Sequence, residues 1–391
     1  MTLRPPMWLL ITISAVGPFS LNAFIPSLPR LADVFATDYG TAQLALTLFL
    51  AGIGVGQLIY GPLSDRYGRR PVLLAGLGLG FAGSVVCLFA PTIEVLLAGR
   101  VAQALGSCSG LVLARAMVRD LYSRDQSAST LGYVTMGMAM MPMVAPGIGG
   151  LLDQTYGWRA SFVAMIAFGG FAFFAARARG YETNHSPLSH IDFTTLTRGW
   201  IALMRSHAFL GYTLAISFNS IQFFGFLATA PYLMVGVLGR PPAEYGLWFA
   251  FCAISYACGN FVAGRWSARI GLDRLAYWGL LAAMLPCVLL VALHVTQGLT
   301  PLGIFGPFFL LGFSNGATQP NLIAGAVSVN PALAGSASGL LGFTQMAMGA
   351  VATVVMGHSQ DGSLLPMAIL FFLCSIGALA SHRLAMRRHA G

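Results

Sequence analysis

The feature that most limits how this chain can fold is the recurrence of long apolar runs that contain almost no charge. Only 8% of the 391 residues are charged, 57% are hydrophobic, and the mean hydropathy is +0.75. Soluble domains carry about 25% charged residues, whereas a helix needs about 20 mostly apolar residues to cross a bilayer. The sequence therefore predicts an all-α integral membrane protein.

Twelve apolar runs are expected to form membrane-spanning helices, six on each side of a long polar stretch. The expected helices are 7–29, 41–60, 72–90, 95–116, 129–152, 159–178, 206–230, 243–266, 274–296, 301–322, 335–357 and 364–383. This pattern predicts an N-terminal six-helix bundle at 1–178, a cytoplasmic linker at 179–205 and a C-terminal six-helix bundle at 206–391.

The arginines predict which side of the membrane each loop occupies. The chain has 21 basic residues, all of them Arg, and every one except Arg30, Arg100, Arg159 and Arg240 falls on one face of the twelve-helix arrangement. Loops rich in Arg remain in the cytoplasm, so both termini are expected there. The net charge of +9 is therefore a consequence of topology, and no nucleic-acid partner is expected.

The sequence offers little for metal binding or catalysis. The six cysteines all lie in apolar runs without C-x-x-C spacing, which is typical of packing residues. The chain has no H-E-x-x-H, no G-x-S-x-G and no paired intramembrane carboxylates. We expect no metal and no cofactor, and an intramembrane enzyme is the weakest alternative.

The most informative stretch is 61–71, a charged turn between two apolar runs with the pattern G-x-L-S-D-R-x-G-R-R-P. It resembles the signature loop of the major facilitator superfamily, whose members are transporters with twelve helices in two pseudo-symmetric bundles. A loop that only orients helices would explain the arginines but not its acid and glycines. The resemblance implies a conformational latch formed by Gly61, Asp65, Arg66, Gly68 and Arg69, with Asp120 pairing with Arg66 or Arg69.

An internal repeat supports two related halves. Four residues of the stretch 61–71 recur with the same spacing 203 positions later. The first copy is Gly61, Ser64, Arg66 and Gly68, and the second copy is Gly264, Ser267, Arg269 and Gly271. Asp65 is replaced by Ala268, so the second copy is degenerate. Parallel repeats of this kind relate the two halves of such transporters.

Two further motifs resemble those of drug/proton antiporters. The run 141–150 resembles an antiporter motif through Pro142, Pro146, Gly147, Gly149 and Gly150, although ordinary small-residue packing would use the same residues.

The second motif is the R-x-x-Q-x-x-G spacing of Arg100, Gln103 and Gly106. Arg100 is the one arginine expected inside the bilayer, either with a role in transport or reaching to the outer interface. Together these features resemble the Bcr/CflA branch of twelve-span drug-efflux facilitators over essentially the whole chain.

One position departs from that branch. The branch carries an acid in its first helix that binds protons or cationic drugs, and here the position is Asn22. Asn cannot titrate, and no acid is expected in the middle of the membrane. The acids nearest to the spans are expected near their outer ends; they are Asp33, Asp38, Glu94, Asp153, Glu244 and Asp361. Proton coupling at this position is therefore not expected, and a pocket that contains Arg100 favours neutral, zwitterionic or anionic substrates.

The expected function is export of small amphipathic compounds, drugs included, by alternating access. The alternative is a specific facilitator for a neutral or anionic metabolite without proton coupling. The resemblance further implies a monomer in the bacterial inner membrane, with protons as a partner only if coupling exists. The residues expected to bind substrate or couple ions are Asn22, Arg100, Met136, Met140, Asn219, Gln222, Phe223, Phe226, Asn315 and Gln319.

Overall fold

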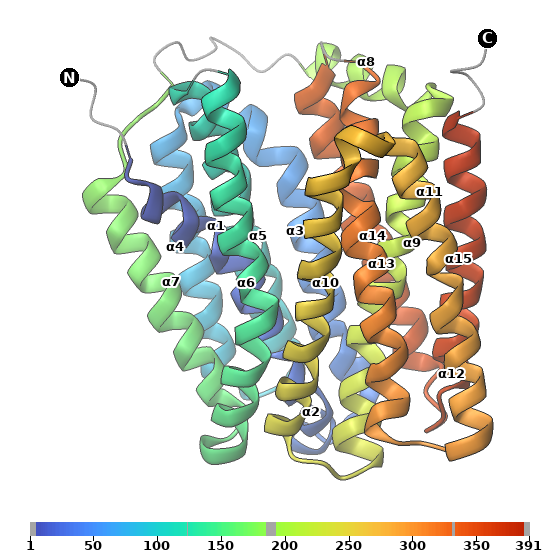
Figure 1. Ribbon diagram of the computed structural model, residues 1–391. Helices are drawn as coiled ribbons and strands as arrows, with labels where there is room; N and C mark the ends of the chain where they lie inside the picture. The colour runs from blue at the N-terminus through green and yellow to red at the C-terminus, as the bar shows by residue number, and fades with distance from the viewer. Residues whose placement is uncertain (1–4, 123, 185–192, 331–332, 387–391) are drawn as a thin grey trace. The chain divides into compact units, whose positions relative to one another are not determined.

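The computed structural model describes residues 5–122, 124–184, 193–330 and 333–386, and these residues contain no strand (Figure 1). The predicted all-α membrane class is confirmed. Contacts between Cα atoms divide the chain into two compact units, unit 1 (Met1–Asp192) and unit 2 (Phe193–Gly391). The division falls within the stretch predicted as a linker.

Unit 1 contains seven α-helices and one short 3-10 turn among its described residues. They are α1 (Met7–Asn22), η1 (Ile25–Ser27), α2 (Leu28–Val34), α3 (Tyr39–Tyr67), α4 (Arg69–Leu88), α5 (Ile93–Leu121), α6 (Arg124–Tyr156) and α7 (Arg159–Arg179). Asp38 caps α3, because its carboxylate accepts hydrogen bonds from the hydroxyl and the backbone N–H of Thr41, and these bonds lower the pKa of Asp38.

Unit 2 repeats this succession of long helices. It contains α8 (Phe193–Met204), α9 (His207–Pro231) with a π-helical turn η2 (Tyr232–Val237), α10 (Pro242–Ile270), α11 (Leu272–Ala282), α12 (Met284–Gln297), α13 (Pro301–Ser328), α14 (Ala334–His358) and α15 (Leu365–Met386). The predicted run 274–296 is thus two helices, since the chain turns at Ala283.

Within the described ranges, eleven helical segments are long and apolar enough to cross a membrane. They account for every predicted span except 301–322, which forms the 28-residue helix α13. Helix α13 is less apolar because it carries Asn315, Thr318, Gln319 and Asn321 within the predicted span. These polar side chains belong to the candidate site described below.

Two stretches that were expected to lie between membrane-spanning helices contain helical residues. In the stretch 61–71, α3 continues through Asp65 to Tyr67, and the helical pattern is interrupted only at Gly68. Gly68 has φ +92°, in the region that favours glycine, and Gly271 has φ +95° at the matching place between α10 and α11. The internal repeat therefore preserves a backbone turn. The predicted linker, in turn, contains α8, whose Trp200 packs against the core of unit 2.

Small residues bring the helices of each unit into close contact. A Cβ atom added at Gly106 of α5 would lie 2.0 Å from the backbone nitrogen of Gly80 on α4. One added at Gly259 of α10 would lie 2.1 Å from the carbonyl oxygen of Phe313 on α13. Close backbone approach through small residues is a main source of helix association in membranes.

We predict that Gly106→Ala destabilises the protein by about 1–3 kcal/mol, because the new methyl group overlaps the Gly80 backbone and α4 must move away from α5. Gly169→Ala in α7 is the matched control, since its Cβ would meet nothing within 4 Å. Thermal unfolding in detergent should show a lower Tm for Gly106→Ala alone. Equal Tm values for the two variants would contradict the packing argument.

Candidate functional site

The guanidinium of Arg69 joins three segments of unit 1 at the α3–α4 turn. Its Nη1 donates to Ser64 Oγ at 2.7 Å and to Asp65 Oδ1 at 2.5 Å, and its Nε donates to Asp120 Oδ2 at 2.9 Å. Asp120 lies in the last turn of α5. Charge-assisted bonds to two carboxylates make this a strong link between α3, α4 and α5.

Of the two partners predicted for Asp120, the structure selects Arg69. Arg66 instead lies over the ring of Tyr67, with its guanidinium carbon 5.0 Å from the ring centroid. The side chain of Arg69 is almost buried, whereas that of Asp65 is 42% exposed. Asp65 therefore keeps an accessible carboxylate edge on the outside of the network.

A segment that the sequence analysis overlooked completes the network. Residues 181–184 follow α7, and the carboxylate of Glu182 accepts hydrogen bonds from the backbone N–H groups of Arg69 at 2.8 Å and Arg70 at 3.0 Å. Thr183 Oγ1 donates to Asp120 Oδ2 at 2.9 Å, and Asn184 Nδ2 donates to the Asp65 carbonyl oxygen at 2.9 Å. The start of the interbundle stretch thus binds the α3–α4 turn directly.

The signal for Glu182 was present in the sequence. The residue before α4 is Gly68, which has no side chain to cap the free N–H groups of the helix. A carboxylate from elsewhere is favoured there by both hydrogen bonding and the helix dipole. A larger residue at Gly68 would also disturb this cap, because its φ of +92° favours glycine and a Cβ atom there would lie 2.6 Å from Glu182 Oε2, so the carboxylate would have to shift.

Arg100 lies in the interior of unit 1, fully buried. Its Nε donates to the carbonyl oxygen of Ala45 at 3.2 Å, and its Nη1 donates to that of Ser20 at 3.2 Å and to Gln103 Oε1. Its guanidinium carbon lies 4.8 Å and 4.1 Å from the ring centroids of Phe24 and Phe49. The side chain is therefore enclosed by the protein. The alternative expectation was that it would reach the outer interface of the membrane.

No described carboxylate forms an ion pair with Arg100, and its Nη2 has no hydrogen-bond partner. Its positive charge is instead stabilised by carbonyl dipoles and aromatic faces. Gln103 extends the contact to α4 by donating to Ser84 Oγ at 2.7 Å. Arg100 and Gln103 thus hold together α1, α3, α4 and α5.

Asn22 lies at a break in the first span. The helix predicted at 7–29 ends at Asn22 and resumes as η1 and α2. Asn22 is buried, its Nδ2 donates to the Pro18 carbonyl oxygen at 2.8 Å, and its Oδ1 has no hydrogen-bond partner. Gln43 on α3 is also buried, and neither of its amide atoms has a hydrogen-bond partner.

The antiporter-like motif, residues 141–150 of α6, contacts the chain where α1 ends. Pro142 and Pro146 lie inside α6, and a Cβ atom at Gly149 would lie 1.9 Å from the carbonyl oxygen of Ala23. Gly149 therefore permits close contact between α6 and the end of α1. Gly147 has no such constraint, since its Cβ would meet nothing within 4 Å, and Gly150 is buried.

Asp153 is the acid whose environment differs most from expectation. It lies near the end of α6, as expected, yet it is the one fully buried acid among the described residues. Its Oδ1 lies 3.3 Å from Arg30 Nη1, and its Oδ2 has no hydrogen-bond partner. Position near a helix end did not imply exposure, because α2 brings Arg30 over it.

In unit 2, the structure separates the predicted polar residues into two groups. Asn219 on α9 donates to Thr318 Oγ1 on α13 at 3.0 Å, and Gln319 accepts a hydrogen bond from Tyr256 of α10. Gln222 instead donates to α15, at the Phe371 carbonyl oxygen (2.9 Å) and Ser375 Oγ (2.8 Å). Sequence reasoning missed Thr318 and Tyr256.

The amide oxygens of Asn219, Asn315 and Gln222 are all buried without a hydrogen-bond partner. Buried polar atoms are nearly always paired in folded proteins. Asn219 and Asn315 place two such acceptors on α9 and α13, whereas Gln222 also links α9 to α15 through its amide nitrogen.

The predicted apolar residues also differ in environment. Phe226 is fully buried and its ring stacks on Phe308, with 3.5 Å between the centroids. Phe223 packs against Phe224 with 5.2 Å between the centroids. Met136 and Met140 are 58% and 51% exposed on α6. Phe226 is therefore held in an aromatic core, while the two methionines remain accessible.

We predict that Glu182→Ala lowers the free energy of unfolding by about 1–2 kcal/mol, because it leaves the first N–H groups of α4 without an acceptor. Glu182→Gln should lose less of the free energy of unfolding, since its one carbonyl oxygen can still accept a hydrogen bond from the backbone of α4. Asp33→Ala, an exposed acid on α2, is the control and should leave the Tm unchanged. The capping role is disproved if the Glu182 variants have the same Tm as the native protein.

Comparisons with known proteins agree with this architecture. The Major Facilitator Superfamily model matches residues 10–353. A bicyclomycin resistance protein homolog of Haemophilus influenzae is 27% identical over 381 residues, which cover 96% of this chain and 94% of that protein. A chloramphenicol resistance protein of Pseudomonas aeruginosa is 34% identical over 329 residues, which cover 82% of this chain and 75% of that protein.

The fold is also found among solved structures. A crystal structure of the peptide transporter POT in complex with alafosfalin matches with a TM-score of 0.77 over 98% of this chain and 94% of that one. The sequence identity is 13%, so this likeness shows the fold alone. The family model, however, spans most of the chain, and on that ground this protein is a member of the Major Facilitator Superfamily.

Proposed function

We propose that this protein exports small amphipathic compounds, drugs among them, across the bacterial inner membrane by alternating access. Its relatives named for resistance to bicyclomycin and chloramphenicol support export of drug-like compounds. The proposed topology places both termini in the cytoplasm, following the arginine-rich loops. The protein acts as a monomer in this proposal.

The observation that carries the proposal is the burial of Arg100 without a carboxylate partner. A cation inside a membrane-spanning helix costs about 2.5–3.5 kcal/mol on insertion scales and usually marks a functional position. In its neighbourhood the branch's acid is replaced by Asn22, which is buried and neutral. The resulting positive potential disfavours cationic drugs and favours neutral, zwitterionic or anionic compounds.

The substrate-contacting residues are proposed from each unit separately. In unit 1 they are Asn22, Met136 and Met140, with Arg100 acting through its charge and by holding α1, α3 and α5. In unit 2 they are Asn219, Asn315, Gln319 and Phe223. Gln222 and Phe226 are assigned to packing, because both are fully buried in contacts with other helices.

A specific facilitator for a neutral or anionic metabolite is the second candidate. Asn22 favours this second candidate, because a neutral or anionic substrate does not need a carboxylate at position 22. Competition assays separate the two candidates. Many unrelated amphipathic compounds inhibit uptake of one another in a polyspecific exporter, whereas one chemical class alone inhibits a specific facilitator.

We predict that the native protein moves its substrate without moving protons and that Asn22→Asp gains substrate-induced proton flux. The measurement is the signal of a pH-sensitive dye in proteoliposomes during exposure to cationic, neutral and anionic compounds. Proton flux with the native protein would show that coupling resides elsewhere.

The matched variant for that experiment is Asp153→Asn, which neutralises the one fully buried acid among the described residues. It should transport like the native protein. Loss of a native proton flux in Asp153→Asn would assign the coupling to the buried Arg30–Asp153 pair and refute uncoupled transport.

We predict that Asp65→Asn slows turnover about threefold to tenfold while substrate affinity stays within about twofold, because the change weakens only the exposed edge of the Arg69 network. Single-turnover uptake and equilibrium binding to the purified protein separate the two effects. Glu94→Gln, an exposed acid in the first turn of α5, is the control. Unchanged turnover in Asp65→Asn would rule out the latch.

A further inference from the structure

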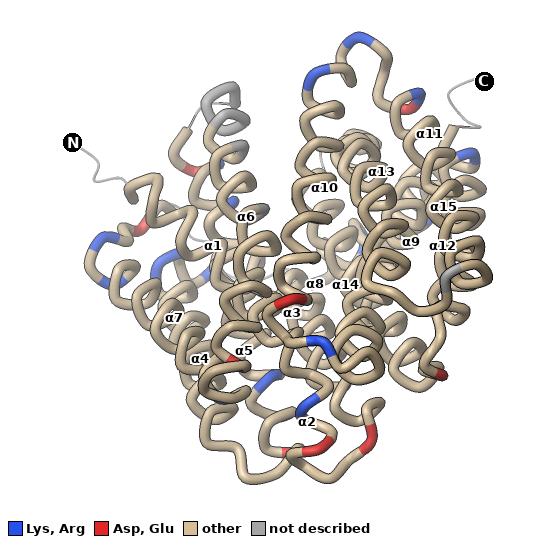
Figure 2. Tube along the Cα trace, turned by 60° about the horizontal axis from the view of Figure 1, so that its bottom comes forward, with Lys and Arg blue, Asp and Glu red and all other residues tan. Residues whose placement is uncertain are grey.

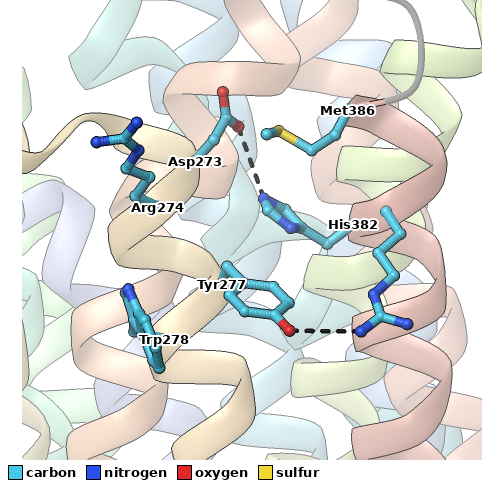
Figure 3. A pocket seen from close by; sticks show the side chains of 7 residues that line it. Asp273, Arg274, Tyr277, Trp278, His382 and Met386 are labelled. Carbon is cyan, nitrogen blue, oxygen red and sulfur yellow. Dashed lines mark hydrogen bonds and ion pairs between the residues drawn. The ribbon is translucent and has the colours of Figure 1, made fainter.

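A cavity in unit 2 lies apart from every residue proposed above. It has a volume of about 560 Å³ and lies between the start of α11 and the end of α15. Figure 3 shows Asp273, Arg274, Tyr277 and Trp278 along one wall and His382 facing them from the other. Figure 2 shows basic residues along the α10–α11 connection and a further basic position towards the end of α15.

Two arginines at this cavity lack an acidic partner. Arg274 and Arg383 are both exposed, and neither forms an ion pair with a described carboxylate. Arg383 Nη2 lies 3.4 Å from the hydroxyl of Tyr277. The one acid in the lining, Asp273, is already engaged, because it accepts a hydrogen bond from Tyr212 at 2.7 Å and lies 3.6 Å from His382 Nε2.

His382 supplies an independent observation in favour of a ligand site. The residue is only 1% exposed, yet neither ring nitrogen has a hydrogen-bond partner. The Asp273 carboxylate lies close enough for an ion pair with a protonated ring but beyond hydrogen-bond distance. A buried imidazole without a hydrogen-bond partner is costly, and this one lines the cavity that the two arginines border.

The adjoining surface suits an acyl chain. Trp278 is 62% exposed and stands one helical turn from Arg274, and Leu281 and Leu285 continue the apolar surface with 42% and 60% exposure. Tryptophan is enriched where membrane spans meet the headgroup region. A basic mouth followed by an apolar strip has the polarity of a phospholipid, with its headgroup at one end.

We propose that this cavity binds the phosphate of an anionic phospholipid from the cytoplasmic leaflet. Arg274 and Arg383 bind the phosphate oxygens, His382 donates a ring N–H, and an acyl chain lies along Trp278 and Leu281. The charge of the two arginines exceeds that of Asp273, which matches an anion better than a zwitterionic headgroup. Basic pockets between helices on this side of a membrane are suited to such lipids.

The test is binding of phosphatidylglycerol to the purified full-length protein in detergent, measured by native mass spectrometry and by the shift in Tm. Phosphatidylcholine and inorganic phosphate are the comparison ligands. We expect phosphatidylglycerol to bind and to raise the Tm, and the other two to have little effect. The double variant Arg274→Gln/Arg383→Gln should lose about 25-fold in affinity, about fivefold for each arginine.

The matched control is Arg265→Gln/Arg269→Gln, which removes the same charge from exposed positions at the end of α10 that do not line the cavity. It should bind phosphatidylglycerol within about twofold of the native protein. An equal loss in both double variants would show attraction to the general surface charge and overturn the site. Equal binding of phosphatidylcholine would overturn the anionic preference.

A third comparison separates the lipid from a free anion. Trp278→Ala should weaken phosphatidylglycerol binding while leaving any effect of inorganic phosphate unchanged, because only the lipid contacts the apolar strip. Tm stabilisation by inorganic phosphate that depends on Arg274 and Arg383, with no preference for phosphatidylglycerol, would replace the lipid with free phosphate. None of these readouts involves transport, so failure of the proposed export function leaves the test intact.

Discussion

The structure depends on one constraint: within a bilayer, the chain itself must satisfy its polar groups, because no water is available. Helices satisfy the backbone, and close contacts at Gly106 and Gly259 supply the attraction between helices that hydrophobic burial cannot provide there. The same constraint explains the surroundings of Arg100. Carbonyl oxygens of Ser20 and Ala45 solvate its charge where a soluble protein could use water.

Sequence reasoning reached the elements whose signal is local. The apolar runs predicted the membrane helices. The fixed spacing of glycine, acid and base at 61–71 indicated the family and a pairing of Asp120 with Arg66 or Arg69, of which the structure contains the Arg69 pair. It failed where polar residues continue a helix, as in α3 beyond residue 60 and in α8 within the predicted linker. Hydropathy indicates which part of a helix lies in the membrane, but the backbone hydrogen bonds of the helix continue into polar residues beyond it.

The candidate site was harder to predict because its members act across helices. Gln222 and Asn219 lie three residues apart on α9, yet one binds α15 and the other binds α13. Glu182 lies 113 residues after Arg69, the first residue of the helix that it caps. Asp153 was placed near a helix end correctly but is buried, since burial depends on Arg30 of α2. Only packing reveals such partners.

The two units differ where the sequence repeat is degenerate. The backbone turns at Gly68 and Gly271 have nearly the same φ, but beside the first the guanidinium of Arg69 pairs with Asp65 and Asp120, and Glu182 accepts hydrogen bonds from the first backbone N–H groups of α4. At the second turn the acid has become Ala268, and the described arginines nearby form no ion pair. Unit 1 thus satisfies Arg69 with carboxylates of its own chain. In the lipid-binding proposal, unit 2 leaves the same kind of charge to an external anion, and the surface beside it is apolar.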